Sequence, residues 1–222
     1  MKIISKSKEG LKTLKQTMSD SNKESAQERQ KTVASEKLAK NIAANEAVVK
    51  KEFTNETWVI SDNLKLKHVT IPKDATGIIV ARSRLPINKQ EELDFLKEII
   101  SATKLIGLGS SVTLIPRIKR PDGKGFLPGP DAIVNGLFFE FKTVTGKINK
   151  IGRRFAESRI QGNNVYIRIE NPRHTKAGVL KELVGLINDK NYSGGYKGKV
   201  IFTIGTGQEE KTYFYRIKNL KK

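Results

Sequence analysis

The chain has 222 residues, and its 42 lysines and arginines outnumber its 23 aspartates and glutamates, which gives a formal net charge of +19. This balance is typical of proteins that bind a polyanion, and it favours nucleic acid over an anionic membrane surface as the partner. The absence of cysteine excludes disulfides, cysteine-ligated zinc and a thiol nucleophile. With only two histidines, a two-histidine zinc site or a histidine relay is also a poor expectation.

No apolar run approaches the roughly 18 residues that a membrane span requires, so we expect no stable membrane insertion. The basic N-terminus MKIISKSKEG lacks the apolar segment of a secretory signal peptide. If the protein leaves its cell, we expect it to do so as part of a longer polypeptide or by another route.

The composition divides the chain into three segments. Residues 1–53 are highly charged and sparse in apolar residues, which predicts one or two polar helices or a flexible basic linker that delivers the rest. Residues 54–87 contain the β-like runs TWVISD, LKLKHVTIP and GIIVARS between turn residues, which predicts a small β-rich subdomain. Residues 88–222 show longer helical and strand patterns and form the expected main domain.

A helix is predicted from Asn88 to Gly107. Asn88 and Glu91 have the spacing of a relaxed capping box, and the acidic residues of the first turns complement the helix dipole. The positions expected to keep helical period toward the core are Leu93, Leu96, Ile99 and Thr103. Residues 111–118 predict a strand, which Pro116 restricts to a sheet edge or a bulge.

The connection after this strand is rich in glycine and proline. Its cations are loop residues that we expect to contact phosphates, namely Lys119, Arg120 and Lys124.

Residues 127–142, LPGPDAIVNGLFFEFK, organise the main domain. Two apolar runs flank Asn135-Gly136, a dipeptide that strongly indicates a two-residue hairpin turn. A turn there places Asp131 opposite Glu140. Period-2 alternation also predicts the core face of the hairpin. Its members are Ala132, Val134, Leu137, Phe139 and Phe141.

The other face of the hairpin carries Asp131, Glu140 and Lys142, directed away from the core. Carboxylates directly opposed across two strands repel each other, and a bound divalent cation would relieve that repulsion. Mg²⁺ or Mn²⁺ suits such oxygen ligands, and Glu98 or Glu92 of the preceding helix is the expected third ligand. In the simpler alternative, the carboxylates are an exposed pair neutralised by nearby cations such as Lys142, Arg117 or Arg153.

A second helix is predicted over residues 148–161, then a strand at 165–169, a helix at 177–188, and two strands at 199–204 and 213–217 that form another hairpin. The second helix and the loop before it carry a basic surface next to the carboxylates. We expect these cations to bind nucleic-acid phosphates. They are Lys147, Lys150, Arg153, Arg154 and Arg159.

From Asn88 onward the predicted order is helix, strand, strand, strand, helix, strand, with Asp131 beginning the second strand and Glu140-Phe141-Lys142 in the third. This arrangement resembles the PD-(D/E)xK nucleases. The resemblance implies an α/β (α+β) fold in which flanking helices cover a central mixed sheet with an αβββαβ core, behind a helical N-terminal segment. It also implies that Asp131, Glu140 and the Phe141 carbonyl hold a metal ion that polarises a phosphodiester and acidifies a water, which Lys142 orients or deprotonates.

A wider stretch, about residues 123–171, resembles the C-terminal nuclease domains of bacterial polymorphic toxins, including contact-dependent inhibition toxins that cleave tRNA. The resemblance implies a toxin that acts in the cytoplasm after delivery from another cell within a larger exported protein. It further implies tRNA as the favoured substrate with DNA as the alternative, a cognate immunity protein as inhibitor, and Gln161 as a further catalytic residue. The matching positions are Pro130, Asp131, Asn135, Gly136, Phe139, Glu140, Lys142, Gly146, Ile148, Gln161, Asn163, Val165 and Ile169.

Two alternatives stay open at the level of sequence. Some tRNA-cleaving toxin domains of this appearance belong to the metal-independent barnase/colicin/RelE-like group, in which Glu140 and Lys142 would act as acid–base and phosphate-binding groups. A non-catalytic nucleic-acid-binding module would use the same basic surface without turnover, and its binding would depend steeply on salt.

Overall fold

The computed structural model describes residues 30, 32–117, 120–122, 126–161, 164–188 and 198–220. The chain divides into two compact units, residues 1–40 and 41–222. Helix α1, described over residues 32–52, begins in the first unit and ends in the second. Among the described residues, no helix is both long and apolar enough to cross a membrane.

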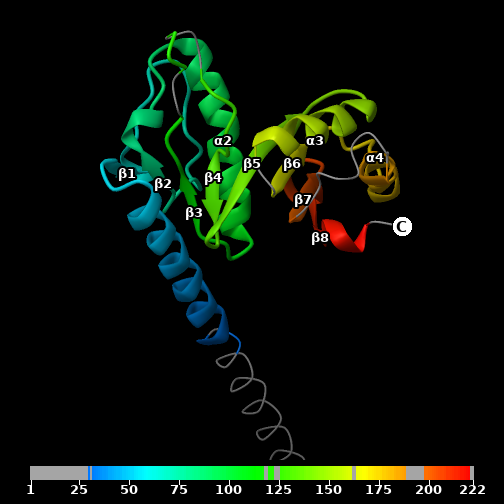
Figure 1. The fold of residues 1–222 in the computed structure, drawn as a ribbon, viewed down its shortest axis with the longest axis horizontal. Coiled ribbons are helices and arrows are strands. Elements are labelled where there is room, and N and C mark those ends of the chain that lie inside the picture. The colour runs from blue at the N-terminus through cyan, green and yellow to red at the C-terminus, as the bar shows by residue number, and fades with distance from the viewer. Residues whose placement is uncertain are drawn as a thin grey trace, which may run out of the picture. The chain divides into compact units, whose positions relative to one another are not determined.

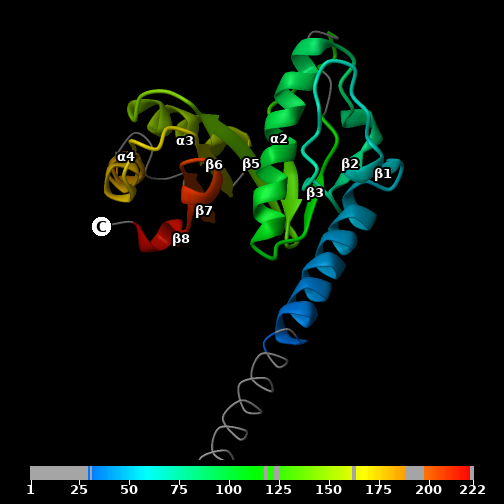
Figure 2. The same cartoon turned by 180° about the vertical axis from the view of Figure 1, so that it is seen from behind.

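The unit of residues 41–222 is a mixed α/β fold with one eight-stranded sheet, whose strands lie side by side in their order along the chain (Figures 1 and 2). The predicted class, a mixed sheet with flanking helices, is confirmed. The strands are β1 (Trp58–Ile60), β2 (Ile79–Ala81), β3 (Val112–Leu114), β4 (Ala132–Val134), β5 (Leu137–Val144), β6 (Val165–Ile169), β7 (Lys199–Ile204) and β8 (Lys211–Arg216). The other helices are α2 (Lys89–Gly107), α3 (Asn149–Gln161) and α4 (Lys176–Asn188).

Helices cover both faces of the sheet. On one face, Phe95, Ile99 and other residues of α2 share a hydrophobic core with Phe141 of β5 and Tyr166 of β6. On the opposite face, α3 and α4 form a second core against β5 to β8. The alternation of side chains along β5 and β6 sends neighbouring residues into different cores. The site described below lies where β5 takes part in both.

The β-like runs of residues 54–87 extend the main sheet. Strand β1 pairs antiparallel with β2, which pairs parallel with β3. The run LKLKHVTIP was predicted to be a strand, but it forms none. The backbone N–H groups of Lys67 and His68 donate instead to the Glu92 carboxylate of α2, at 3.1 and 2.6 Å. A carboxylate thus replaces the strand partner.

Strand β3 lies inside the sheet, between β2 and β4, and not at an edge as Pro116 led us to expect. The strand ends at Leu114, so the proline follows it and removes no hydrogen bond from either ladder.

The predicted cap of α2 is confirmed, but the predicted inner side is partly wrong. The side chain of Asn88 accepts a hydrogen bond from the Glu91 N–H at 2.9 Å. Leu93 is 39% exposed, whereas Phe95 is buried. The buried side of α2 also includes Glu92 and Glu98, whose carboxylates have partners there, and hydrophobic periodicity does not detect such positions.

The predicted hairpin is confirmed. Asn135 and Gly136 have φ angles of 51° and 78°, as a primed two-residue turn requires, and Val134 pairs with Leu137. Of the five residues expected on the core face, four are buried, while Leu137 beside the turn is 38% exposed. Asn45 of α1 holds the turn, since its Oδ1 accepts the Gly136 N–H at 2.7 Å.

Strand β5 changes partners along its length. Residues 137–139 pair with β4, and residues 140–144 pair in parallel with β6. From Glu140 onward, the edge of β5 that faced β4 is therefore no longer part of that ladder. This step in the sheet is where the polar side chains converge.

Candidate active site

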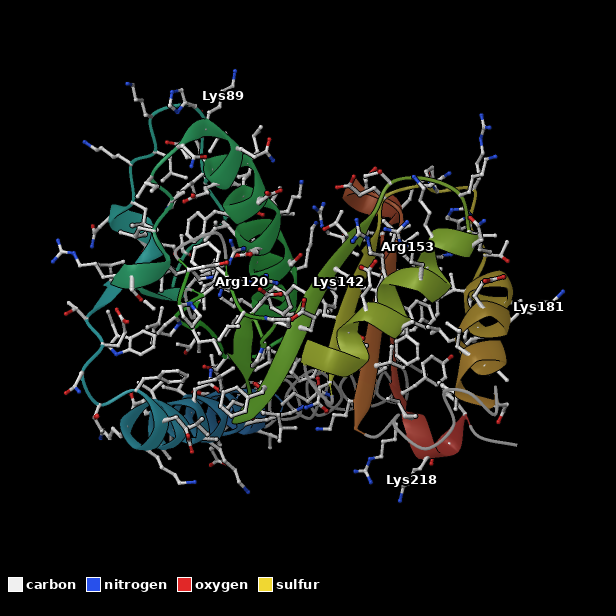
Figure 3. All side chains as sticks on the ribbon, turned by 45° about the horizontal axis from the view of Figure 1, so that its top comes forward. Lys89, Arg120, Lys142, Arg153, Lys181 and Lys218 are labelled. Atoms are coloured by element: carbon white, nitrogen blue, oxygen red, sulfur yellow. The ribbon has the colours of Figure 1, made fainter. Side chains whose placement is uncertain are left out.

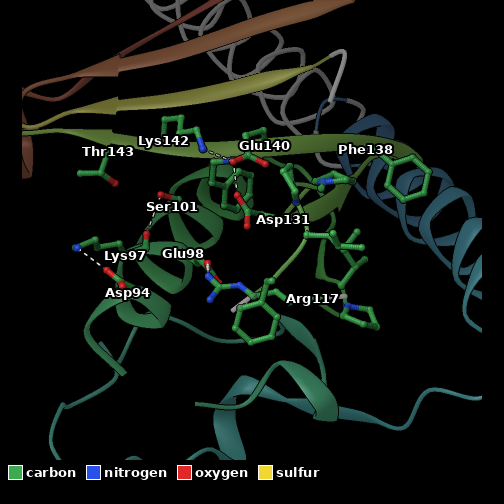
Figure 4. Close-up of a pocket in the computed structure, with 18 of the residues that line it drawn as sticks. Asp94, Lys97, Glu98, Ser101, Arg117, Asp131, Phe138, Glu140, Lys142 and Thr143 are labelled. Carbon is green, nitrogen blue, oxygen red and sulfur yellow. Dashed lines mark hydrogen bonds and ion pairs between the residues drawn. The ribbon is translucent and has the colours of Figure 1, made fainter. Parts of the chain in front are cut away.

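A cavity of about 510 Å³ lies at the step in the sheet, lined by α2, β5, α3 and the segment before β4 (Figure 4). Carboxylates, cations and aromatic rings all contribute to its wall. The charged residues are Asp94, Lys97, Glu98, Arg117, Asp131, Glu140, Lys142 and Arg154, and the rings are Phe53, Phe126, Phe138 and Phe141.

Asp131 and Glu140 come together as predicted, although the ladder of β4 and β5 ends one residue short of them, at Ala132 and Phe139. The Asp131 N–H donates to the carbonyl of Phe139 at 2.9 Å. The carboxylate of Asp131 then accepts the N–H of Phe141 at 2.9 Å. The side chain of Asp131 thus takes the place of a strand partner for β5.

Glu140 is buried, contrary to the expectation of an exposed carboxylate directed away from the core. Its side chain is 3% exposed and forms an ion pair with Lys142. The side chain of Glu140 lies on the α3 side of β5. Glu140 is in register with Val165, whose side chain belongs to the second core, and paired residues of neighbouring strands lie on the same face of the sheet. Lys142 accordingly lies two residues further along the same side.

The pKa of Glu140 is raised to about 8 by burial and then by the negative charge of Asp131, and the opposing effect of Lys142 is smaller. Glu140 therefore takes up a proton at a higher pH than a carboxyl group in water. Among the described residues, its Oε2 atom is buried without a hydrogen-bond partner in the ionised form, whereas in the protonated form it shares a hydrogen bond with Asp131.

Arg84 is a residue of this site that the sequence did not predict. Its side chain is 0% exposed, and Nη2 contacts Asp131 at 2.6 Å while Nε contacts Glu98 at 2.8 Å. Nη1 donates to the carbonyl of Ile115 at 2.7 Å. Burial alone would lower the pKa of Arg84, but Glu98 and Asp131 outweigh it and raise the pKa, so the guanidinium stays charged. In the sequence, Arg84 is the third residue after the apolar run GIIVA, behind Arg82 and Ser83, and its spacing is not distinctive.

Glu98 lines the cavity, but it does not join the carboxylate pair as the third ligand we expected. Its Oε2 accepts a hydrogen bond from Arg84, and its Oε1 accepts one from Arg117. Glu92, the other suggested ligand, holds the loop at His68. Within the described ranges, no group of three or more acidic, histidine or cysteine side chains is placed to hold a metal ion.

A divalent cation at Asp131 and Glu140 would share the Asp131 carboxylate with Arg84 and the Phe141 N–H. A cation between the two carboxylates would give the buried Oε2 of Glu140 a partner and would lower its raised pKa by compensating both negative charges. Oxygen ligands are those that Mg²⁺ and Mn²⁺ prefer.

The predicted phosphate-binding cations have different positions. Arg154 lines the cavity, whereas Arg153, Lys147 and Lys150 are exposed. Arg153 and Arg154 both pair with Glu157, at 3.0 and 2.8 Å. Figure 3 shows other labelled cations, including Lys89 and Lys181, on separate elements.

The remaining predicted site residues lie away from the cavity wall or outside the described residues. The exposed Arg120 donates to the Phe126 carbonyl at 3.3 Å. Lys119 and Lys124 lie outside the described residues, as do the side chains of Arg159 and Gln161 at the end of α3. Lys97, a cavity cation on α2, was not among the predicted residues.

The simpler alternative is confirmed in part, since nearby cations neutralise both carboxylates and Lys142 pairs with Glu140 as expected. The carboxylates are not exposed, however, and Arg117 and Arg153 pair with Glu98 and Glu157 instead. The partner of Asp131 is the buried Arg84.

Comparison of the chain with protein-family models, curated proteins and solved structures found no match.

Proposed function

We propose that this protein is a nuclease that hydrolyses phosphodiester bonds of nucleic acid with the help of a divalent metal ion. The observation that carries the proposal is the pairing of Asp131 with the buried Glu140, beside Lys142, in the wall of a cavity. A net charge of +19 favours a polyanionic substrate.

In this proposal Asp131 and Glu140 hold Mg²⁺ or Mn²⁺, with the Phe141 carbonyl as a further ligand. The ion would supply polarisation of the scissile phosphodiester and a water of lowered pKa. Lys142 orients or deprotonates the attacking water and compensates the charge that develops on the phosphate. Arg154 and Lys97, which line the same cavity, bind the phosphates on either side.

The biological role we propose is that of an antibacterial toxin effector. The order α2, β3, β4, β5, α3, β6, with Asp131 before β4 and Glu140 and Lys142 in β5, has the arrangement of the PD-(D/E)xK pattern. The resemblance of residues 123–171 to polymorphic toxin nucleases supports tRNA as the favoured substrate, with DNA as the alternative. A cognate immunity protein and a cytoplasmic site of action belong to the same proposal.

One observation favours a second candidate, a metal-independent ribonuclease. Because the pKa of Glu140 is about 8, its carboxyl group exchanges a proton close to neutral pH, as a general acid or base must. Lys142 would then bind the phosphate. The two candidates share residues and differ in their response to chelation.

The test is incubation of the protein with plasmid DNA and with tRNA, in Mg²⁺, in Mn²⁺ and in EDTA. We expect Asp131→Ala, Glu140→Ala and Lys142→Ala each to slow cleavage at least about 100-fold, since each removes a group that acts at the reacting phosphate. Matched controls are Glu209→Ala and Lys181→Ala, which alter exposed residues outside the cavity and should cleave normally.

Cleavage that persists in EDTA but is lost in the Glu140 and Lys142 variants would favour the metal-independent candidate. Full cleavage by all three variants would contradict both. Binding without cleavage under every condition would point to a non-catalytic module.

A further inference from the structure

The cavity wall contains aromatic rings that the proposed chemistry does not use. Phe53, Phe126 and Phe138 line the cavity, and each of these residues is half-buried. In Figure 4, Phe138 lies on one side of Asp131 and Glu140, and Lys97 and Thr143 lie on the other. The carboxylates thus stand between the Phe138 ring and a polar region.

Strand β5 sets the spacing of these regions. Phe138, Glu140 and Lys142 occupy alternate positions, so their side chains follow one another on the same side of the strand, about 7 Å apart at each step. An aromatic ring, a buried carboxylate and a cation in this order match the parts of one nucleotide and its neighbour: a base, a scissile phosphodiester and the next phosphate.

We propose that the Phe138 side of the cavity binds the base of an unpaired nucleotide, so that the substrate is a single-stranded segment or loop of nucleic acid and not an intact duplex. This inference rests on the proposed nuclease function. It adds the substrate class and assigns Phe138 as the residue on which the base stacks.

Burial of the reacting group supports this choice. The Glu140 side chain is 3% exposed, so a phosphodiester must enter the cavity to reach it. A cavity of about 510 Å³ is large enough for one nucleotide. A paired base would first have to leave its stack, at a cost of about a few kcal/mol, which an unpaired nucleotide avoids.

The chemistry of the wall supports it as well. Bases of any identity stack on aromatic side chains, which is how proteins bind single strands without reading sequence. The guanidinium of Arg117 already lies over the Phe126 ring, 5.5 Å from its centre. Lys97, Lys142 and Arg154 place three cations along the polar side, each paired with a carboxylate that a phosphate would replace: Asp94, Glu140 and Glu157.

The test measures binding with cleavage suppressed. The Glu140→Gln protein is titrated with a fluorescent 12-nucleotide strand and with its duplex, in ribonucleotide and deoxyribonucleotide forms, and anisotropy is recorded. We expect the single strand of at least one form to bind roughly tenfold more tightly than its duplex, and Phe138→Leu to remove roughly tenfold of that affinity.

Phe214→Leu is the matched control, because Phe214 is a 57% exposed ring on β8 outside the cavity. A double-mutant cycle then locates the stacked base. Strands that each lack one base are titrated against the Glu140→Gln protein and against the same protein with Phe138→Leu. The loss of one particular base should weaken binding when Phe138 is present and should have no effect when leucine replaces it. Thermal melting verifies the fold, and Phe126→Leu replaces Phe138→Leu if the latter is unfolded.

Equal binding of strand and duplex, or equal effects of the Phe138 and Phe214 substitutions, would overturn the inference. The outcome is separable from that of the nuclease proposal. If the wild-type protein cleaves neither form but the binding pattern holds, the nuclease function fails while the base-binding site stands. If the wild-type protein cleaves duplex and strand equally well, the nuclease function holds and the inference fails.

Discussion

A carboxyl group buried beside a second carboxylate retains its proton to higher pH than one in water, and Glu140 is in this position. Its pKa is about 8 in the folded protein, compared with an ordinary value of 4.5. Between these values the native state binds more protons than the unfolded chain, so the stability that this group contributes falls as pH rises. It is fully present below pH 4.5 and is lost as pH passes 8.

We therefore expect Glu140→Gln, which mimics the protonated carboxyl group, to raise the melting temperature at pH 9 and to leave it nearly unchanged at pH 4. Adding Mg²⁺ should stabilise the wild-type protein more at pH 8.5 than at pH 5.5, because the ion competes with the proton. Thermal melting from pH 4 to pH 9 measures both effects. A stability difference between variant and wild type that does not vary with pH would show that Glu140 titrates normally.

Arg84 acts on the site through Asp131. It joins the carboxylates of Asp131 and Glu98 from inside the protein, where its side chain is 0% exposed. Arg84→Met would leave both carboxylates buried without this partner, and we expect it to cost about 3–5 kcal/mol of unfolding free energy, measured by urea denaturation. An effect below about 1 kcal/mol, the level of a surface pair, would contradict the contacts described.

The conservative variant separates positioning from stability. Lysine keeps the charge but has no planar fork with which to join two carboxylates. Arg84→Lys should therefore fold and bind the substrate, yet show a kcat at least about tenfold lower with little change in KM, as expected when an interaction of the transition state is lost. Arg82→Lys, at an exposed arginine two residues away, is the control and should leave kcat unchanged.

At the scale of elements, Asn45 connects helix α1 to the carboxylate hairpin. The Nδ2 of Asn45 donates to Ser111 Oγ at 3.0 Å, and its Oδ1 accepts from the turn at Gly136. Asn45 is 2% exposed, and its replacement by alanine would leave the half-buried Gly136 N–H without this acceptor. We expect Asn45→Ala to reduce the unfolding free energy by about 2 kcal/mol in urea denaturation.

The adjacent exposed residue of the same helix gives the control: Glu46→Ala should change stability by less than about 0.5 kcal/mol. Equal effects of the two substitutions would mean that Asn45 does not secure the hairpin.

The elements that the sequence predicts well are those specified by local chemistry. Asn135-Gly136 determines its own turn and thereby the register that brings Asp131 to Glu140, and Asn88 caps α2 without help from the rest of the fold. The errors concern charges that become buried. Arg84 and Glu98 are unremarkable until the sheet places them face to face, since their energies depend on partners distant in sequence.

At the scale of the whole molecule, two hydrophobic cores lie on opposite faces of one sheet, and β5 contributes to both. Phe141 enters the first core, and Val144 enters the second. Glu140 lies next to Phe141 in β5, at the point where the strand changes its partner from β4 to β6. The two cores on either side of the sheet shield its side chain from water. The cavity therefore belongs to the unit of residues 41–222 as a whole.

The last prediction concerns where this unit begins. Residues 32–40 of α1 are all exposed, whereas Asn45 is buried and Phe53 lines the cavity. We expect a chain of residues 41–222 to keep the melting temperature and the cleavage rate of the full chain. Removing residues 41–53 as well should lower the melting temperature by at least about 4 °C, since it deletes the hydrogen bonds of Asn45, and should slow cleavage through loss of one wall of the cavity. Unfolding of the 41–222 chain, or full activity of the shorter 54–222 chain, would contradict this boundary.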